Sequence, residues 1–326
     1  MAAAVAGGLR DGGRGTVELP LADGGEGTLD VLLHALGGER RSVTVRDPLG
    51  RPVRAAYGLV DRGRTAVVEM AQASGLGLVA ERERDAWAAS TYGTGEVIAA
   101  ALADGSVRTV LVTVGGSATT DGGAGALEAL RDAGFLTPGS TRAPSRRGSR
   151  KATKGGGGVD FVVACDVRTA WEDAARVFAP QKGADAATVR RLERRLASLA
   201  QRAPRDPRGV PMTGAAGGLA GGLWAHVGAR LVSGANYVLD AVAFDEQMRA
   251  SRLVVTGEGR VDEQSLTGKV VGEVATRCRQ RGVACHAVVG ENDLDAFQAR
   301  LIDLSTITEA GTTRRLRTAG RRLAEI

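Results

Sequence analysis

The chain has 326 residues, of which 43% are hydrophobic and only 3% aromatic, with 47 glycines and a net charge of +6. This length suits one large domain or two ordinary ones, and the composition is typical of an α/β protein with many tight turns. No apolar run is long enough to span a membrane and no signal-peptide pattern opens the sequence, so we expect a cytoplasmic protein. Three cysteines without C-x-x-C or Cys/His spacing give neither a disulfide framework nor a zinc motif.

The predicted elements follow a strand–helix pattern that is interrupted once. Residues 41–70 alternate by twos and are cut by "DPLG" and "DRG", which predicts antiparallel strands joined by hairpins. The strand–helix alternation resumes from Thr91. In chain order, the other expected elements are a helix ending near residue 10, a strand at 16–21, a helix at 28–35, buried strands at 109–114 and 159–167, a helix over 189–199, a glycine-rich helix over 215–229, and a strand, loop and helix over 252–275.

The stretch "VLVTVGGSATTDGGAGALEAL" (Val110–Leu130) contains the first candidate ligand loop. A buried strand ends at two glycines, and a helix begins near Asp121. A strand end, a glycine turn and a helix start together leave backbone N–H groups free at the carboxyl edge of a sheet, where anions bind. The alternative is a tight turn in which glycine only permits positive φ and Asp121 only caps the helix. Because Ser117, Thr119 and Thr120 also stand in the loop, we favour a ligand loop.

Polar glycine loops are expected at four strand ends, 22–28, 115–123, 164–167 and 256–264, and "APQKG" (179–183) follows a helix. In an open parallel sheet the carboxyl ends of the strands share one edge, so such loops converge on one crevice. The charged residues that they carry include Asp23, Glu26, Asp121, Asp166, Lys182, Glu258, Arg260 and Asp262. Carboxylates, glycine N–H groups and a few cations suit a phosphate held with Mg²⁺. Asp23 could instead shape a turn, and Lys182 and Arg260 could be solvated surface charges.

Other phosphate and nucleic-acid patterns are weak. Val270 follows Lys269 where a P-loop needs Ser or Thr, and "GEGRVD" lacks the third glycine of G-x-G-x-x-G. The segment Thr141–Lys154 has six basic residues and no acidic one, without interleaved aromatic residues. We interpret it as part of a mobile basic loop near 132–158 rather than as a nucleic-acid surface.

Several motifs, in this order, resemble the bacterial glycerate kinase type 1 family over most of Leu19–Gly311. They are "PLADGGEGT", "GTGE", "GGSATTDGGAGALEAL", "VACDV", "VFAPQKGA", "GAAGGLAGGL" and "LVVTGEGRVDEQSLTGKV". The resemblance implies ATP-dependent phosphorylation of D-glycerate, usually at the 2-hydroxyl, with ATP and Mg²⁺ as cofactors. It also implies two α/β domains with the active site in the cleft between them. We expect a discontinuous Rossmann- or flavodoxin-like parallel-sheet domain at 1–40 and 250–326, and a second α/β domain with antiparallel hairpins at 41–249.

The resemblance also implies roles for the loop residues. The expected catalytic residues are Asp166, as general base or Mg²⁺ ligand, with Lys182 and Arg260 offsetting charge on the transferring phosphoryl group. The expected metal ligands are Asp121, Asp166 and Asp262. Expected nucleotide-binding residues are Gly24, Gly25, Gly115, Gly116, Ser117, Thr119, Gly257, Glu258 and Gly259. Expected substrate-binding residues are Asp23, Glu26, Thr28, Gln181 and Gln264.

Two departures from the family pattern leave an alternative open. The chain starts after the "APDSFKGS"-like strand with which family members normally begin, and an arginine- and glycine-rich segment stands between Arg131 and Gly158. The alternative is therefore a truncated, catalytically inactive homologue that only binds ligand. In either case we expect small-molecule partners, D-glycerate and ATP, and neither nucleic acid nor membrane, with a homodimer left open.

Overall fold

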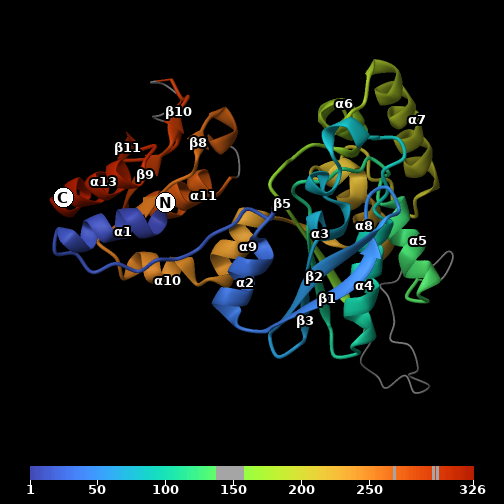
Figure 1. Cartoon of the computed structure of the whole chain (residues 1–326), viewed down its shortest axis with the longest axis horizontal. Helices are drawn as coiled ribbons and strands as arrows, with labels where there is room; N and C mark the ends of the chain where they lie inside the picture. The colour runs from blue at the N-terminus through green and yellow to red at the C-terminus, as the bar shows by residue number, and fades with distance from the viewer. Residues whose placement is uncertain (137–157, 267–268, 296–297, 299–300) are drawn as a thin grey trace. The chain divides into compact units, whose positions relative to one another are not determined.

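The computed structural model describes residues 1–136, 158–266, 269–295, 298 and 301–326, and only the backbone of Gln264 and Leu266 (Figure 1). The basic segment Thr141–Lys154 lies outside these residues. The described chain forms two compact units, one of Met1–Leu21 with Ala235–Ile326 and the other of Ala22–Gly234. Each unit is described by itself below.

A six-stranded sheet in the order β1-β2-β3-β4-β5-β6 forms the centre of the larger unit. Its first three strands are antiparallel neighbours, as the alternating pattern of residues 41–70 predicts, and β3 to β6 run parallel. The predicted mixed α/β fold class is therefore confirmed. The strands are β1 (Glu39–Arg46), β2 (Pro52–Val60), β3 (Thr65–Glu69), β4 (Thr109–Thr113), β5 (Asp160–Cys165) and β6 (Arg230–Ser233).

Helices pack on both faces of this sheet. On one face Val68, Val112 and Val163 contribute to a core that also contains Ile98 and Leu223 of the covering helices. The helices of the unit are α2 (Thr28–Leu36), α3 (Ala71–Ser74), α4 (Tyr92–Ala103), α5 (Ala124–Asp132), α6 (Ala174–Phe178), α7 (Ala186–Arg202) and α8 (Leu219–Val227). Short 3₁₀ turns lie at Leu76–Leu78, Glu81–Glu83, Trp171–Asp173, Pro180–Lys182 and Ala215–Gly218.

Helix α2 packs tightly on strand β2. A Cβ atom on Gly58 would lie 2.7 Å from Leu29 Cδ1 and 3.2 Å from Leu33 Cδ2, so the helix approaches the strand at a position without a side chain. This contact explains why residues 22–40 belong to the larger unit. The predicted domains were 1–40 with 250–326, and 41–249. The compact units instead divide the chain after Leu21 and after Gly234.

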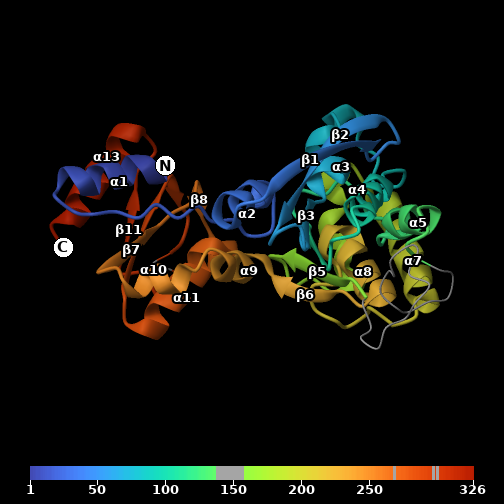
Figure 2. The ribbon, with the colours of Figure 1, turned by 90° about the horizontal axis from the view of Figure 1, so that it is seen from below.

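The smaller unit contains a parallel three-stranded sheet in the order β11-β9-β7 and a parallel pair, β8 with β10. Figures 1 and 2 both show α1 beside α13, where Asp11 accepts hydrogen bonds from Arg317 and Arg321. The elements are α1 (Ala2–Asp11), α9 (Gly234–Ala241), α10 (Phe244–Arg249), β7 (Leu253–Thr256), β8 (Arg260–Val261), a 3₁₀ turn at Glu263–Leu266, α11 (Val270–Arg281), β9 (Ala284–Val289), β10 (Glu291–Asn292), β11 (Thr306–Glu309) and α13 (Thr313–Ala324).

The strand predicted at 16–21 is wrong. This segment has no ladder partner among the described strands, and Pro20 has no N–H to donate to one.

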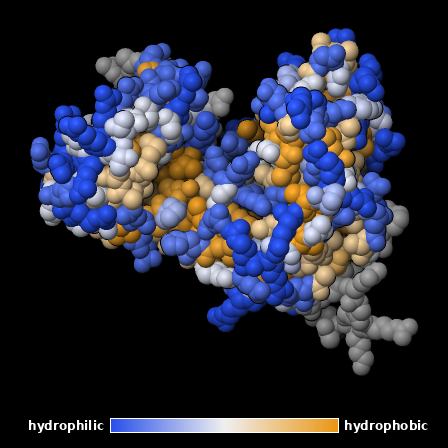
Figure 3. Space-filling view, viewed as in Figure 1, coloured by the Kyte–Doolittle hydropathy of each residue, from blue (hydrophilic) through white to orange (hydrophobic). Residues whose placement is uncertain are grey.

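The face of the molecule in Figure 3 is largely hydrophilic, with smaller apolar patches. Among the described helices, none combines the length and apolarity that crossing a membrane requires.

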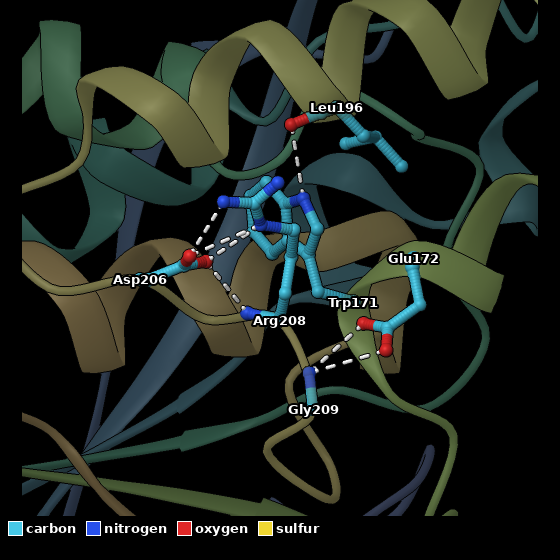
Figure 4. A network of polar contacts seen from close by, with 6 residues as sticks. All are labelled: Trp171, Glu172, Leu196, Asp206, Arg208 and Gly209. Atoms are coloured by element: carbon cyan, nitrogen blue, oxygen red, sulfur yellow. Dashed lines mark hydrogen bonds and ion pairs between the residues drawn. The ribbon is translucent and has the colours of Figure 1, made fainter.

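The layer that contains α6 and α7 is held by one buried tryptophan. The indole Nε1 of Trp171 donates to the carbonyl oxygen of Leu196 at 3.0 Å (Figure 4). Next to it, Glu172 accepts from the backbone N–H of Gly209, and Asp206 binds the guanidinium of Arg208. Of these contacts only that of Trp171 is buried, and it connects the turn before α6 to α7.

The ring of Trp171 also sets a steric limit on the loop after β4. A Cβ atom on Gly122 would lie 2.8 Å from Trp171 Cη2 and 2.9 Å from Leu199 Cδ1. Gly122 has in addition a φ of +65°, a conformation that favours glycine. Both the backbone and the packing therefore require glycine at this position.

We predict that Gly122→Ala lowers the free energy of unfolding more than Gly105→Ala does. Gly105 has a similar φ of +73° but nothing within 4 Å of its virtual Cβ. The matched control therefore carries only the left-handed backbone cost of about 1–2 kcal/mol. Overpacking against Trp171 should add roughly 1–3 kcal/mol at Gly122. Urea unfolding of both variants measures the difference, and equal losses would contradict the packing argument.

Candidate functional site

Three of the predicted loops meet at the carboxyl edge of the six-stranded sheet. The backbone N–H of Gly115 donates to the carbonyl oxygen of Gly24 at 3.2 Å. A Cβ atom on Gly115 would lie 2.4 Å from Gly25 Cα, and one on Gly24 would lie 3.0 Å from the carbonyl oxygen of Ala164. Loop 22–28 thus lies directly against the ends of β4 and β5, and only glycine allows this approach.

The polar residues of loop 22–28 shape the start of α2. Asp23 Oδ1 accepts from the backbone N–H of Gly25 at 3.0 Å, and Thr28 Oγ1 donates to the carbonyl oxygen of Gly25 at 2.8 Å. Glu26 is exposed, and its carboxylate lies over Gly116, where a Cβ atom would be 2.6 Å from Oε1. Asp23 therefore shapes a turn, which is the alternative to a ligand role considered for it above. The substrate roles predicted for Asp23, Glu26 and Thr28 stay predictions.

Lys182 is the most unusual side chain of this edge, because it is 1% exposed. Its Nζ donates to Ser117 Oγ at 2.8 Å and to the carbonyl oxygen of Thr119 at 2.6 Å. Burial lowers the pKa of its ammonium group to about 7, and the charge of Asp121 acts in the opposite direction. Lys182 is therefore not a solvated surface charge. Its ammonium group is held against the loop after β4, whereas the neighbouring Gln181 is exposed.

Asp121 is 1% exposed and accepts hydrogen bonds with both carboxylate oxygens. Oδ2 accepts from the backbone N–H and the hydroxyl of Thr91 and from the N–H of Gly125, and Oδ1 accepts from the N–H of Gly123. These contacts cap the start of α5 and connect it to the start of α4. They account for the burial of the charge, and the metal role of Asp121 stays a prediction.

Asp166 directly follows β5, where the sequence places it, and is partly buried. Burial, with a smaller contribution from the charge of Asp166, raises the pKa of the neighbouring Cys165 thiol to about 12, so this cysteine stays protonated. No group of three His, Cys, Asp or Glu side chains that could hold a metal occurs within the described part of the chain. The metal-ligand roles of Asp166 and Asp262 are therefore predictions.

The remaining predicted residues lie in the smaller unit, after β7. The carbonyl oxygens of Glu258 and Gly259 accept from the N–H groups of Gly290 and Glu291. Arg260 is bound by Asp293, which raises the pKa of its guanidinium group. Asp262 Oδ1 accepts from the N–H of Ser265 at 3.3 Å and lies 3.8 Å from Lys269 Nζ. The side chain of Gln264 lies outside the described residues.

Sequence reasoning missed Glu69, which ends β3 and is 4% exposed. Its Oε2 accepts from Gln72 Nε2 at 3.0 Å, but its Oε1 is buried and has no hydrogen-bond partner among the described residues. The signal was available: a carboxylate directly after the apolar run "AVV" has the same pattern as Asp166 after "VVAC". The pattern was missed because no glycine loop follows Glu69.

Comparisons with known proteins identify the family of this chain. The glycerate kinase family matches residues 1–319. Glycerate kinase of Halalkalibacterium halodurans is 41% identical over 86% of this chain and 75% of its own length. Glycerate 2-kinase of Escherichia coli K12 is 36% identical over 90% of this chain and 84% of its own length. A crystal structure from Salmonella typhimurium LT2, provisionally described as glycerate kinase 2, has a TM-score of 0.76 at 33% identity and covers 99% of this chain and 92% of its own.

The fold is that of a class of kinases that act on small molecules. The chain belongs to the glycerate kinase family. The resemblance inferred from the motifs is confirmed, and the protein is a kinase.

We predict that Lys182 makes the stability of the protein depend on pH. Its folded pKa of about 7 lies below the ordinary value of 10.5, so between these values the unfolded state binds more protons. The free energy of unfolding should therefore rise with pH from about 7 to about 10, by roughly 1 kcal/mol per pH unit from this group. Below pH 7 Lys182 is charged in both the folded and the unfolded protein, and its contribution to the free energy of unfolding is lowest there.

Urea unfolding of the wild type and of Lys182→Met at pH 7, 8 and 9 tests this dependence. Methionine keeps the length of the side chain and removes the titration. The wild-type minus variant difference isolates Lys182 from cysteines and tyrosines that titrate in the same range. Parallel pH profiles of the two proteins would contradict the lowered pKa.

Proposed function

We propose that this protein transfers the γ-phosphoryl group of ATP to D-glycerate, with Mg²⁺, and forms 2-phosphoglycerate. The observation that carries the proposal is the buried Lys182 ammonium bound inside the glycine loop after β4. A buried cation without a paired carboxylate is unfavourable alone and gains a counter-charge when an anion binds. The names of the relatives, glycerate kinase and glycerate 2-kinase, support the substrate and the 2-position.

The loop around Lys182 suits a phosphate group. Gly115 and Gly116 allow loop 22–28 to lie against the loop after β4, because side chains there would collide with Gly25 and Glu26. The hydroxyls of Thr119 and Thr120 are buried and have no hydrogen-bond partner among the described residues. We assign the loop Gly115–Thr120 and Lys182 to the phosphates of ATP. Approach of a phosphate should raise the pKa of Lys182, so that the ammonium is charged when the phosphoryl group is transferred.

Asp166 is assigned to the acceptor hydroxyl. It stands at the carboxyl end of β5, next to the strand whose loop contacts Lys182, and Gly24 of loop 22–28 packs on the preceding Ala164. A carboxylate at this position accepts the proton of the attacking hydroxyl or orients a metal ion. Bound Mg²⁺ would offset charge on the phosphates, and Asp166, Asp121 and Asp262 keep their predicted metal roles. The predicted nucleotide-binding role is kept for Gly257, Glu258 and Gly259, and the charge-offsetting role for Arg260. The predicted substrate-binding role is kept for Gln181 and Gln264.

Release of ADP with ATP, Mg²⁺ and D-glycerate tests the proposal. ³¹P NMR of the product identifies the phosphorylated hydroxyl. A protein that binds ATP or glycerate in calorimetry but releases no ADP would be the ligand-binding homologue instead. A cytoplasmic location, and a homodimer as the assembly, belong to the same proposal and are tested by fractionation and by ultracentrifugation.

We predict that Asp166→Asn lowers kcat by about 10²–10⁴-fold, the range typical of acid–base groups. Asparagine keeps the size of the side chain and removes its charge. Asp160→Asn is the matched control, because Asp160 is exposed at the opposite end of the same strand. Circular dichroism and the melting temperature show that both variants fold. Retention of more than about a tenth of the wild-type kcat in Asp166→Asn would exclude the catalytic role.

A further inference from the structure

Four residues form a row across the sheet at its carboxyl edge. Glu69 of β3 pairs with Thr113 of β4, which pairs with Ala164 of β5, which pairs with Val232 of β6. Paired residues of neighbouring strands point to the same face, and adjacent residues along a strand point to opposite faces. The row therefore lies on the face opposite Val68, Val112 and the core packed on them.

Two atoms of this row are buried without partners. Glu69 Oε1 and Thr113 Oγ1 make no hydrogen bond with the described part of the chain, although Glu69 is 4% and Thr113 0% exposed. Gln72 Nε2 holds the other carboxylate oxygen of Glu69, so the orientation of Oε1 is fixed. A carboxylate oxygen only accepts, whereas a threonine hydroxyl both donates and accepts. A ligand hydroxyl complements the pair, because it can donate to Glu69 and accept from Thr113.

The row lies where loop 22–28 crosses the sheet. Gly24 contacts the backbone of Ala164, and Gly25 contacts Gly115, two residues after Thr113. Helix α2, which starts from this loop, covers the same face, since Leu29 packs on Gly58 and Gly58 pairs with Val67, two residues before Glu69. Ala164, which pairs with Thr113, contributes only a methyl group to the row. The pair is thus placed at the edge that contains the candidate site.

We propose that Glu69 and Thr113 bind a hydroxyl group of the acceptor substrate, a small hydroxy acid. The proposal rests on the proposed function and assigns to it a specificity pair that the loop motifs do not contain. Glu69 accepts a hydrogen bond from the substrate hydroxyl, and Thr113 donates one to it. An acid that lacks this hydroxyl leaves both buried groups unpartnered, which is the physical basis of strong discrimination against deoxy analogues.

Calorimetric titration with D-glycerate, D-lactate and 3-hydroxypropionate tests the pair, because the two analogues each lack one of the hydroxyls of glycerate. The wild type should bind the analogue that lacks the recognised hydroxyl at least 10-fold more weakly than D-glycerate. Glu69→Gln presents an amide N–H₂ in place of the accepting oxygen. It should raise the Kd for D-glycerate about 10-fold or more and remove the difference between D-glycerate and that analogue. Thr113→Val should do the same to a smaller extent.

Glu81→Gln and Thr109→Val are the matched controls, the first exposed and the second at the opposite end of β4. Neither should change the Kd for D-glycerate, and no variant should change the KM for ATP. A lower melting temperature of Glu69→Gln with an unchanged Kd and analogue ratio would overturn the proposal, since the pair would then hold only buried water. Absence of any hydroxy-acid binding by the wild type would also overturn it. Failure of the proposed function is seen separately, as wild-type protein that binds D-glycerate but releases no ADP.

Discussion

The hydrogen bonds of Lys182 to Ser117 and to the backbone of Thr119 are the constraint on which the larger unit depends. They connect the chain between α6 and α7 to the loop after β4, and they do so with a buried charged group. An ammonium group removed from water needs compensation, and two acceptors satisfy only part of it. The lowered pKa is the consequence, since part of the cost is avoided when the proton is released. An apolar side chain would avoid this cost but would lose both hydrogen bonds that connect the two segments.

Glycine determines how closely the loops approach each other. Gly24, Gly25 and Gly115 bring two backbones into contact at the carboxyl edge, and Gly122 makes room for the ring of Trp171. The tryptophan in turn holds α7 through Leu196 (Figure 4). The geometry of the loop after β4 is therefore coupled to the packing of α6 and α7, because Gly122 of the loop contacts Trp171. Lys182 lies between these two helices. The indole ring is large, and it fits because Gly122 of the loop and Gly221 of α8 have no side chains.

The sequence predicted the elements whose pattern is local. The hairpins of residues 41–70, the buried strands β4 and β5, and the meeting of loops 22–28, 115–123 and 164–167 follow from periodicity and from parallel-sheet geometry. The strand at 16–21 was wrong because a strand needs a partner, and partners are not encoded locally. The assignment of residues 22–40 depended on the contact of Leu29 with Gly58, which only the tertiary structure shows. Glu69 is a different case, because its position after an apolar run was visible in the sequence, whereas its burial and its unsatisfied oxygen depend on neighbours from β4 and α3.

The buried carboxylates of the larger unit differ in how many protein donors their oxygens meet, and this number does not follow their burial. Asp121 is more buried than Glu69, yet four protein donors satisfy it. Asp47 is also buried, and its oxygens accept from the backbone of Leu49 and from Arg51 in the turn after β1. Both charges are explained by the fold. Glu69 has a single donor, from Gln72, and beside it a threonine hydroxyl without a partner. Since an unsatisfied buried oxygen costs about 1–3 kcal/mol, the fold would be more stable with an apolar residue there. The proposed substrate hydroxyl would complete the hydrogen bonds of both groups.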